Sequence, residues 1–195
     1  MTISTARSVT ERRKKVVGLN GTPRVGGNSE VLLDQALSGA AESGAHVMRI
    51  DVARMKISGC DACGSCTDSG ICVKDDDMTS VYSALEGADA IIVASPLYFS
   101  GLSSQLKAAI DRCQCIWVSG PARSGRPGAF ICVGGDNNAN FKNAVSEARS
   151  FMKGIGFEGR MEMLVAGLDV LGMAAKRADL LDKARELGRD LVLQA

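Results

Sequence analysis

Apolar runs alternate along the chain with longer segments whose apolar residues recur every three or four positions. The runs have the length of buried strands, and they span residues 14–20, 46–52, 88–95, 128–135 and 160–167. The intervening segments have the period of amphipathic helices over residues 29–43, 78–87, 102–117, 140–155 and 174–193. Because strand and helix alternate throughout, the pattern predicts an α/β fold with a parallel sheet and helices on both faces.

This pattern fills one domain. The chain has 195 residues, a length that one domain with a single hydrophobic core can accommodate. We expect residues 14–195 to form the domain and residues 1–13 to form a solvated tail. The tail lacks the apolar stretch of a signal peptide, and no apolar run approaches the length of a bilayer span. The sequence therefore predicts a cytoplasmic protein with no membrane partner.

Net charge and cysteine content reduce the number of possible function classes. The net charge is +1, and no basic stripe indicates a nucleic-acid partner. Thiols stay reduced in the cytoplasm, and the seven cysteines are an odd number, which argues against a disulfide framework. Four of the seven fall within residues 59–72, "GCDACGSCTDSGIC", and need another explanation.

The loop after the first strand, residues 20–29, has the features of a phosphate site. In an open parallel sheet, ligands bind beyond the carboxyl ends of the strands, and a helix N-terminus attracts phosphate. Thr22, Asn28 and Ser29 add side-chain donors, with Asn28 or Ser29 expected as the helix N-cap. Arg24 adds a planar charge that can hold phosphate oxygens. The glycine spacing fits neither a Walker loop nor a dinucleotide fingerprint, and a plain strand-to-helix turn is the alternative.

The loop after the third strand offers a surface for a flat ring. It begins at Pro96 and continues with Leu97, Tyr98, Phe99 and Ser100. Two aromatic residues beside small polar ones can form the wall of a ligand site. The alternative is that Tyr98 and Phe99 simply plug the end of the sheet.

Gly135 and Asp136, which follow the fourth strand, reach the same edge. A phosphate site after one strand and an aromatic wall after another would together hold a phosphate at one end and a planar ring at the other. This combination is what FMN requires.

Three segments resemble the NADPH-dependent FMN reductase group of flavodoxin-like proteins: "GLNGTPRVGGNSEVLLDQAL", "ADAIIVASPLYFSGLSSQLKAAIDR" and "ARELGRDL". With the cysteine loop and the "DDDM" behind it, the chain is similar more narrowly to the iron–sulfur flavoproteins. The resemblance covers roughly residues 14–193. It implies a flavodoxin-like three-layer sandwich, a five-stranded sheet in order 2-1-3-4-5, bound FMN, a [4Fe-4S] cluster, and a homodimer or homotetramer.

The four cysteines of residues 59–72, the cysteine loop, allow more than one interpretation of what they bind. Cys60, Cys63, Cys66 and Cys72 follow the spacing C-x2-C-x2-C-x5-C, which suits one compact cubane cluster better than the two separated knuckles of a zinc site. A zinc site or a loop of free thiols remains open. The other three cysteines are expected to be small buried hydrophobes: Cys113, Cys115 and Cys132.

These features predict an FMN oxidoreductase whose cofactor carries the chemistry, so that no catalytic side chain is required. We expect electrons to pass between NAD(P)H or reduced ferredoxin and a quinone, a flavin, an oxygen species or a protein. One alternative is a non-catalytic electron carrier in the manner of flavodoxin. Such carriers dock through strongly acidic faces, however, and the acidic and basic residues of this chain are nearly equal in number. Another is a zinc-bearing regulatory flavoprotein.

Overall fold

The computed structural model describes residues 12–195. Most of the tail predicted over residues 1–13 therefore lies outside the described residues. At its described end, Arg12 donates hydrogen bonds of 2.7 and 2.9 Å to the two carboxylate oxygens of Asp89. Within the described part of the chain, no helix has the length and apolar character needed to cross a membrane.

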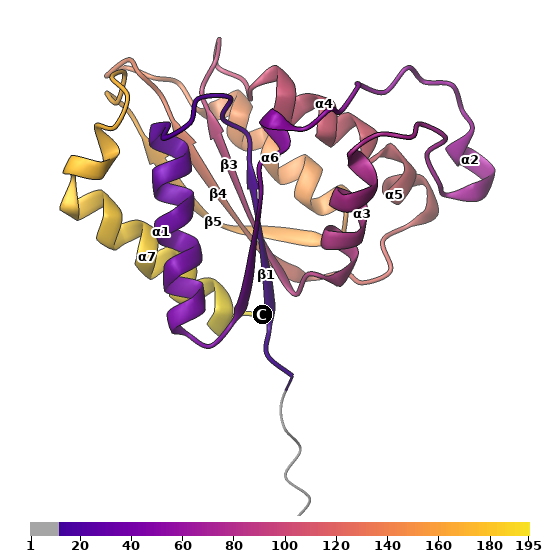
Figure 1. Cartoon of the computed structure of the whole chain (residues 1–195), viewed down its shortest axis with the longest axis horizontal. Coiled ribbons are helices and arrows are strands. Elements are labelled where there is room, and N and C mark those ends of the chain that lie inside the picture. The colour runs from indigo at the N-terminus through magenta and orange to yellow at the C-terminus, as the bar shows by residue number, and fades with distance from the viewer. Residues whose placement is uncertain (1–11) are drawn as a thin grey trace, which may run out of the picture.

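Five parallel strands form one sheet in the order β2-β1-β3-β4-β5, as predicted (Figure 1). The strands are β1 (Lys15–Asn20), β2 (His46–Ile50), β3 (Ala90–Pro96), β4 (Arg126–Val133) and β5 (Phe157–Val165). Strand β1 pairs with β2 on one side and with β3 on the other, so the strand order reverses there. The connections leave β1 and β3 in opposite directions, which opens a crevice at their carboxyl ends.

Helices cover both faces of this sheet (Figure 1). On one face lie α1 (Asn28–Glu42) and α7 (Ala178–Leu193), which pack against each other. On the other lie α3 (Met78–Gly87), α4 (Ser104–Arg112) and α6 (Lys142–Gly154).

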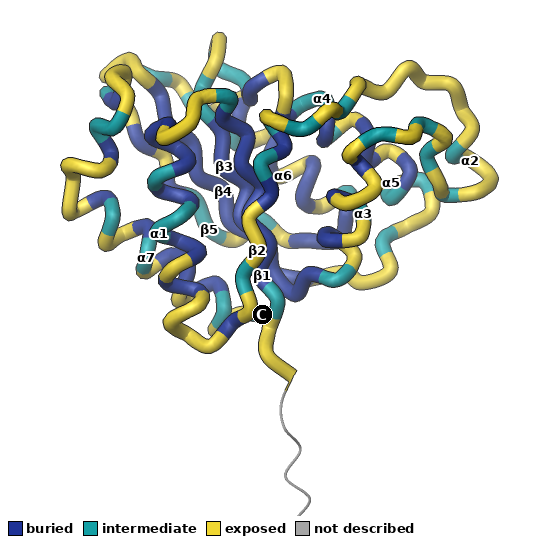
Figure 2. Tube along the Cα trace, viewed as in Figure 1, coloured by how far each residue is buried: buried dark blue, intermediate teal, exposed yellow. Residues whose placement is uncertain are grey.

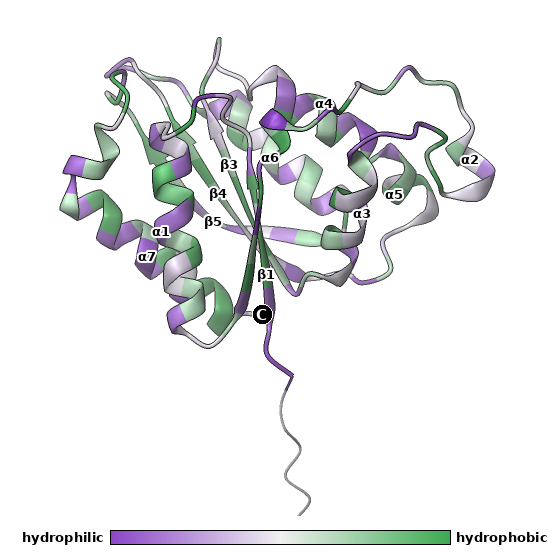
Figure 3. Ribbon diagram, viewed as in Figure 1, coloured by the Kyte–Doolittle hydropathy of each residue, from purple (hydrophilic) through white to green (hydrophobic). Residues whose placement is uncertain are grey.

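Successive strand residues alternate between the two cores. Val17 and Leu19 belong to the core under α3, α4 and α6, whereas Val16 belongs to the core under α1 and α7. The three central strands, β1, β3 and β4, are therefore buried along most of their length, whereas the edge strands β2 and β5 are partly exposed (Figures 2 and 3). This double burial explains why their sequences show apolar runs rather than alternation.

The helix predicted over residues 102–117 is two helices, α4 and α5 (Gln114–Ser119), with Cys113 between them. A continuous helix would need the Arg112 carbonyl to accept from the backbone N–H of Ile116. That carbonyl instead accepts a 2.8 Å hydrogen bond from the Tyr82 hydroxyl. Ile116 donates to Cys113 at 3.0 Å, which tightens the turn.

Other boundaries also differ from the prediction. The fifth strand begins at Phe157 rather than at 160, because a register shift opposite Gly128 lets it continue through a bulge. The last helix begins at Ala178 rather than at 174, after a short 3-10 helix, η2 (Ala174–Lys176). Two short elements were not predicted: the 3-10 helix η1 (Val52–Arg54) and, inside the cysteine loop, α2 (Cys66–Ser69).

Candidate functional site

The loops after β1, β3, β4 and β5 meet around a cavity of about 190 Å³ at the carboxyl edge of the sheet. Small-molecule sites commonly enclose about 300–1,000 Å³, so a ligand of flavin size would fill this cavity and extend beyond it. Eight of the predicted cofactor residues line the cavity: Thr22, Arg24, Asn28, Ser29, Pro96, Leu97, Tyr98 and Gly135. We call this space the switch-point cavity.

Hydrogen-bond donors are free at the N-terminus of α1, on one side of this cavity. The N-cap is Gly27, not Asn28 or Ser29 as predicted, and no side chain caps the helix. Among residues 12–195, no atom accepts a hydrogen bond from the backbone N–H of Asn28 or Ser29. The Arg24 side chain is exposed and has no carboxylate partner in the described chain. This donor set fits a phosphate group.

The backbone of the first loop closes tightly around the same point. A Cβ atom on Gly27 would lie only 2.9 Å from Thr22 Oγ1 and 3.0 Å from the Arg24 carbonyl oxygen. Gly26 has a φ of 68°, a left-handed conformation that costs glycine little. Both glycines therefore let the loop bring its amides close to an anion.

A buried carboxylate lies beneath this loop, but its charge is neutralised. Glu30 accepts a 3.2 Å hydrogen bond from the backbone N–H of Gly26. Its carboxylate also pairs with Arg54, and with Arg49 at 3.3 Å. Both guanidinium groups also pair with Asp51, and Arg49 pairs with Asp34 as well. This network of ion pairs therefore neutralises Glu30 without adding net positive charge beside the first loop.

Asn28 holds the last loop rather than offering a free donor. Its side-chain amide donates to the carbonyl oxygens of Leu168 and Val170, each at 2.9 Å. Its side-chain oxygen accepts from the backbone N–H of Ala174 at 3.0 Å. These bonds use both amide protons, so Asn28 positions the loop between β5 and α7 against the cavity.

The third loop is a strained hairpin. Tyr98 and Gly101 exchange backbone hydrogen bonds of 3.0 and 2.9 Å. Between them, Phe99 and Ser100 have φ values of 49° and 62°, which are unfavourable for residues with side chains. The Tyr98 side chain lines the switch-point cavity and is 38% exposed, so it does not plug the sheet end. Phe99 is fully exposed.

Three predicted cofactor residues lie outside the cavity lining: Phe99, Ser100 and Asp136. The Asp136 carboxylate accepts from the backbone N–H of Asn138 at 2.7 Å and shapes its own turn. The prediction also missed several lining residues: Gly27, Val133, Leu168, Asp169 and Leu171. Gly27 lies in the first loop itself, and Val133 ends β4. The other three residues follow β5, and that position is their only signal in the sequence.

Arg112 ties down both ends of the cysteine loop. Its guanidinium donates to the Ser58 carbonyl at 2.8 Å and to the Lys74 carbonyl at 3.5 Å. It also donates to both oxygens of Asp76, at 2.6 and 3.2 Å. The Arg112 side chain is 1% exposed, so this pair is buried under the loop. Asp76 in turn accepts from the Ser58 backbone N–H at 3.2 Å.

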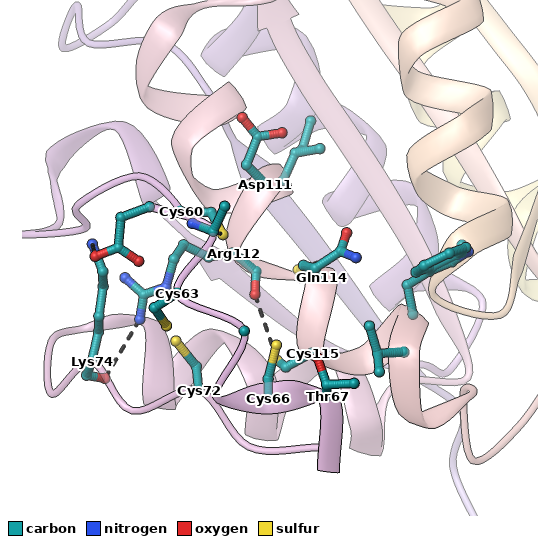
Figure 4. Close-up of a pocket in the computed structure, with 18 of the residues that line it drawn as sticks. Cys60, Cys63, Cys66, Thr67, Cys72, Lys74, Asp111, Arg112, Gln114 and Cys115 are labelled. Carbon is teal, nitrogen blue, oxygen red and sulfur yellow. Dashed lines mark hydrogen bonds and ion pairs between the residues drawn. The ribbon is translucent and has the colours of Figure 1, made fainter. Parts of the chain in front are cut away.

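A second cavity, of about 590 Å³, lies between the cysteine loop and the helices α4, α5 and α6. We call it the thiol cavity (Figure 4). Six of the seven cysteines line it: Cys60, Cys63, Cys66, Cys72, Cys113 and Cys115. In Figure 4 the sulfur atoms of Cys63 and Cys72 point toward one another. All the cysteines are free thiols.

The thiol cavity supplies ligands for a metal group but not a preformed cage. Within residues 12–195, no three His, Cys, Asp or Glu side chains are placed to hold a metal ion. Four thiols on one loop are nevertheless the donor set that an iron–sulfur cluster uses, and metal sites commonly assemble only on binding. The predicted ligands therefore fit in their chemistry and share one cavity.

Arg112 also places positive charge beside one of these thiols. Burial raises the pKa of the Cys72 thiol, but the backbone N–H of Lys74, the Arg112 guanidinium and the Tyr82 hydroxyl together lower it below its ordinary value. The Nε atom of Arg112 is buried and has no hydrogen-bond partner among the described residues. A free donor next to a stabilised thiolate suits an anionic thiolate-bound group.

Comparison with known proteins identifies the family. The family model described as NADPH-dependent FMN reductase matches residues 14–167. The chain is 35% identical to an iron–sulfur flavoprotein of Methanosarcina thermophila over 138 residues, which cover 71% of this chain and 72% of the relative. It is 32% identical to an iron–sulfur flavoprotein of Methanocaldococcus jannaschii over 137 residues, 70% of each chain.

Solved structures share the fold at lower identity. An NAD(P)H:quinone oxidoreductase from Methanothermobacter marburgensis has a TM-score of 0.67 and 21% identity, over 92% of this chain and 96% of its own. An FMN-dependent NADH-azoreductase from Bacillus anthracis in complex with FMN has a TM-score of 0.69 and 14% identity, over 92% and 99%. The chain thus has a flavodoxin-like fold, is similar in sequence to relatives named iron–sulfur flavoproteins, and belongs to the NADPH-dependent FMN reductase family of FMN oxidoreductases.

Proposed function

We propose that this protein binds FMN in the switch-point cavity and transfers electrons between NAD(P)H or reduced ferredoxin and a quinone, a flavin, an oxygen species or a protein acceptor. The observation that carries the proposal is the set of free donors at the N-terminus of α1, beside the exposed and unpaired Arg24. Such a set attracts phosphate, and the family model that matches residues 14–167 is one of FMN reductases.

In this proposal each loop has a separate task. The first loop holds the phosphate with its amides, with Thr22 and Ser29 beside them and Arg24 closing the site. The hairpin after β3 places Tyr98 against the ring, and Gly135 allows close approach from the next loop. Bound FMN supplies hydride and single-electron transfer, so the protein needs only to bind, orient and shield it.

We further propose that Cys60, Cys63, Cys66 and Cys72 hold a [4Fe-4S] cluster, with Arg112 supplying positive charge beneath it. Such a cluster exchanges single electrons, which would link a hydride donor to one-electron partners. The printed name of the iron–sulfur flavoprotein relatives and the shared thiol cavity support this assignment.

We also propose a homodimer or homotetramer located in the cytoplasm. Exposed large apolar side chains lie on three loops at the carboxyl edge of the sheet, and contact with a second copy would cover them: Val25, Phe99, Val170 and Leu171. Light scattering of the flavin-loaded protein tests the assembly, and a monomer at micromolar concentration would contradict it.

Anaerobic titration tests the choice of electron donor. We expect NADPH to bleach the flavin absorbance band of the FMN-loaded protein. With NADPH present, the protein should also reduce an added quinone. A protein that NADPH leaves oxidised, but that reduced ferredoxin reduces, would retain the oxidoreductase proposal and exclude the nicotinamide donor. A flavin that neither donor reduces would contradict the proposed reaction.

Arg24→Ala should weaken FMN binding by about 1–3 kcal/mol, the range for a hydrogen bond to a charged group. The physical reason is the loss of Arg24, the one cationic residue that lines the switch-point cavity within residues 12–195. Fluorescence titration of the apoprotein with FMN and with riboflavin measures the effect, and only the FMN affinity should fall. Arg149→Ala, on α6 and paired with Glu162, is the matched control. Equal FMN affinity in both variants would show that Arg24 does not bind the phosphate.

Tyr98→Ala should change the reduction potential or affinity of the flavin without unfolding the protein. The side chain is 38% exposed and lines the cavity, while its hydrogen bonds with Gly101 are made by backbone atoms that the substitution keeps. Spectroelectrochemistry and thermal unfolding measure the two effects. A large fall in melting temperature with normal flavin properties would restore the interpretation that Tyr98 plugs the sheet.

A further inference from the structure

Two cysteines that were predicted to be buried hydrophobes lie in the wall of the thiol cavity. Cys113 and Cys115 are only 3% and 4% exposed, as expected of buried residues. Both nevertheless line the thiol cavity beneath the four loop cysteines. Cys132, in contrast, is buried inside β4 and lines none of the cavities described above. The prediction is thus confirmed for their burial, but it did not place two of them beside the loop.

Cys115 lies next to Cys66. The short helix α2, which begins at Cys66, packs against α5, which carries Cys115. The contact is close, because a Cβ atom on Gly70 would collide with the side chain of Ser119. Helix α2 has only four residues, so Cys66 lies within about one turn of this contact. Figure 4 draws both residues in the wall of the thiol cavity.

Open space adjoins Cys115 on two sides. Cys115 lines the thiol cavity and also a further cavity of about 400 Å³, which lies behind the loop between α3 and α5. The Cys115 thiol donates only one long hydrogen bond, of 3.5 Å, to the Arg112 carbonyl. Cys115 therefore stands at the junction of two cavities, where its side chain has room to turn.

We propose that Cys66 and Cys115 form a reversible disulfide when the loop carries no metal. Hydrogen peroxide would oxidise the Cys66 thiol to a sulfenic acid, releasing one water molecule. The Cys115 thiol then attacks that sulfur, a new S–S bond forms, the S–O bond breaks, and a second water molecule leaves. The two thiols lose two electrons and two protons, and the peroxide is reduced.

The disulfide would give Cys115 a protective role in addition to its packing in the core. A sulfenic acid without a neighbouring thiol proceeds to sulfinic acid, which is not reversed by thiols. A disulfide to α5 would instead keep one loop ligand recoverable and fix α2 against the body of the protein. The inference concerns the metal-free protein, so its test is separate from the proposed cluster and flavin chemistry.

Peptide mapping tests the pair in the full-length, flavin-loaded protein. The protein is freed of metal with a chelator under reductant, exposed to hydrogen peroxide, alkylated and digested with trypsin. Cleavage at Lys and Arg places Cys66 in the peptide 57–74 and Cys115 in the peptide 113–123. We expect these two peptides to be cross-linked, with fragmentation assigning the bond to Cys66 and Cys115, and dithiothreitol to release them.

Three variants sharpen the result. Cys115→Ser should abolish the cross-link and raise sulfinic acid on peptide 57–74 several-fold, whereas Cys113→Ser and Cys132→Ser should change neither. Circular dichroism confirms that each variant is folded. A disulfide confined to peptide 57–74, such as one between Cys63 and Cys72, would overturn the proposal. So would a cross-link that persists in Cys115→Ser.

Discussion

Serine in place of any one of Cys60, Cys63, Cys66 and Cys72 is expected to remove most of the protein-bound iron while FMN stays bound. The four thiols act as a unit, because a cubane that lacks one corner ligand is exposed and labile. The flavin loops lie at the carboxyl edge of the sheet and do not include the thiol cavity lining. Iron, sulfide and FMN analysis of anaerobically prepared variants measures both effects.

The buried cysteines are the matched controls. Cys132→Ser should keep its iron and lose only stability, because it places a hydroxyl group inside β4. Cys113→Ser and Cys115→Ser test whether the inner wall of the thiol cavity supplies a ligand. Iron loss in Cys115→Ser equal to that in Cys66→Ser would mean that the ligand set extends beyond the loop. Full iron content in all four loop variants would contradict the assignment.

Asp76→Asn is expected to lower the free energy of unfolding by about 3–5 kcal/mol, the usual cost of breaking a buried ion pair by removing one partner. Arg112 is 1% exposed and would keep its charge without a counterion. The substitution also weakens the bonds that hold Ser58 at the start of the cysteine loop. Chemical denaturation measures the change. Asp75→Asn is the matched control, since Asp75 is exposed, and its effect should stay within about 0.5 kcal/mol.

The ion pair between Asp76 and Arg112 makes the free energy of unfolding depend on pH. The Arg112 guanidinium, and after it the backbone amides of Met78 and Ser58, lower the pKa of Asp76 from 3.8 to about 2, against a smaller opposing effect of burial. The folded state therefore holds the proton less tightly than the unfolded state does. This contribution is complete above about pH 4 and is lost as the pH falls toward about 2. Asp76→Asn should flatten this part of the stability profile, and an unchanged profile would contradict the role.

Much of the fold could be predicted from the sequence because burial on both faces makes the central strands β1, β3 and β4 mostly apolar. The run that became β3 illustrates this, since every residue from Ala90 to Ser95 is buried. The place of the ligand loops then follows from parallel topology, which collects the carboxyl ends of the strands at one edge. Thr22 and Tyr98 were found in this way, and both line the switch-point cavity.

The parts that were missed depend on contacts between distant residues. Asp75, Asp76 and Asp77 precede α3, where acidic residues favour a helix N-terminus, and Asp76 does accept a 3.1 Å hydrogen bond from the Met78 backbone N–H. Its principal partner, however, is Arg112, 36 residues away. Cys115 was assigned to the core by its helical spacing. Spacing indicates which face of a helix is buried but not which loop covers that face, so its proximity to Cys66 could not be predicted.

The most direct test of the central claim is the cofactor content of protein purified without oxygen. We predict about one FMN per chain together with about four iron and four labile sulfide, and no zinc. Loss of iron and sulfide from the Cys66→Ser variant at unchanged FMN content would assign the cluster to the cysteine loop. Wild-type protein that contains FMN but neither iron nor labile sulfide would contradict the account, and zinc in their place would identify the loop as a zinc site.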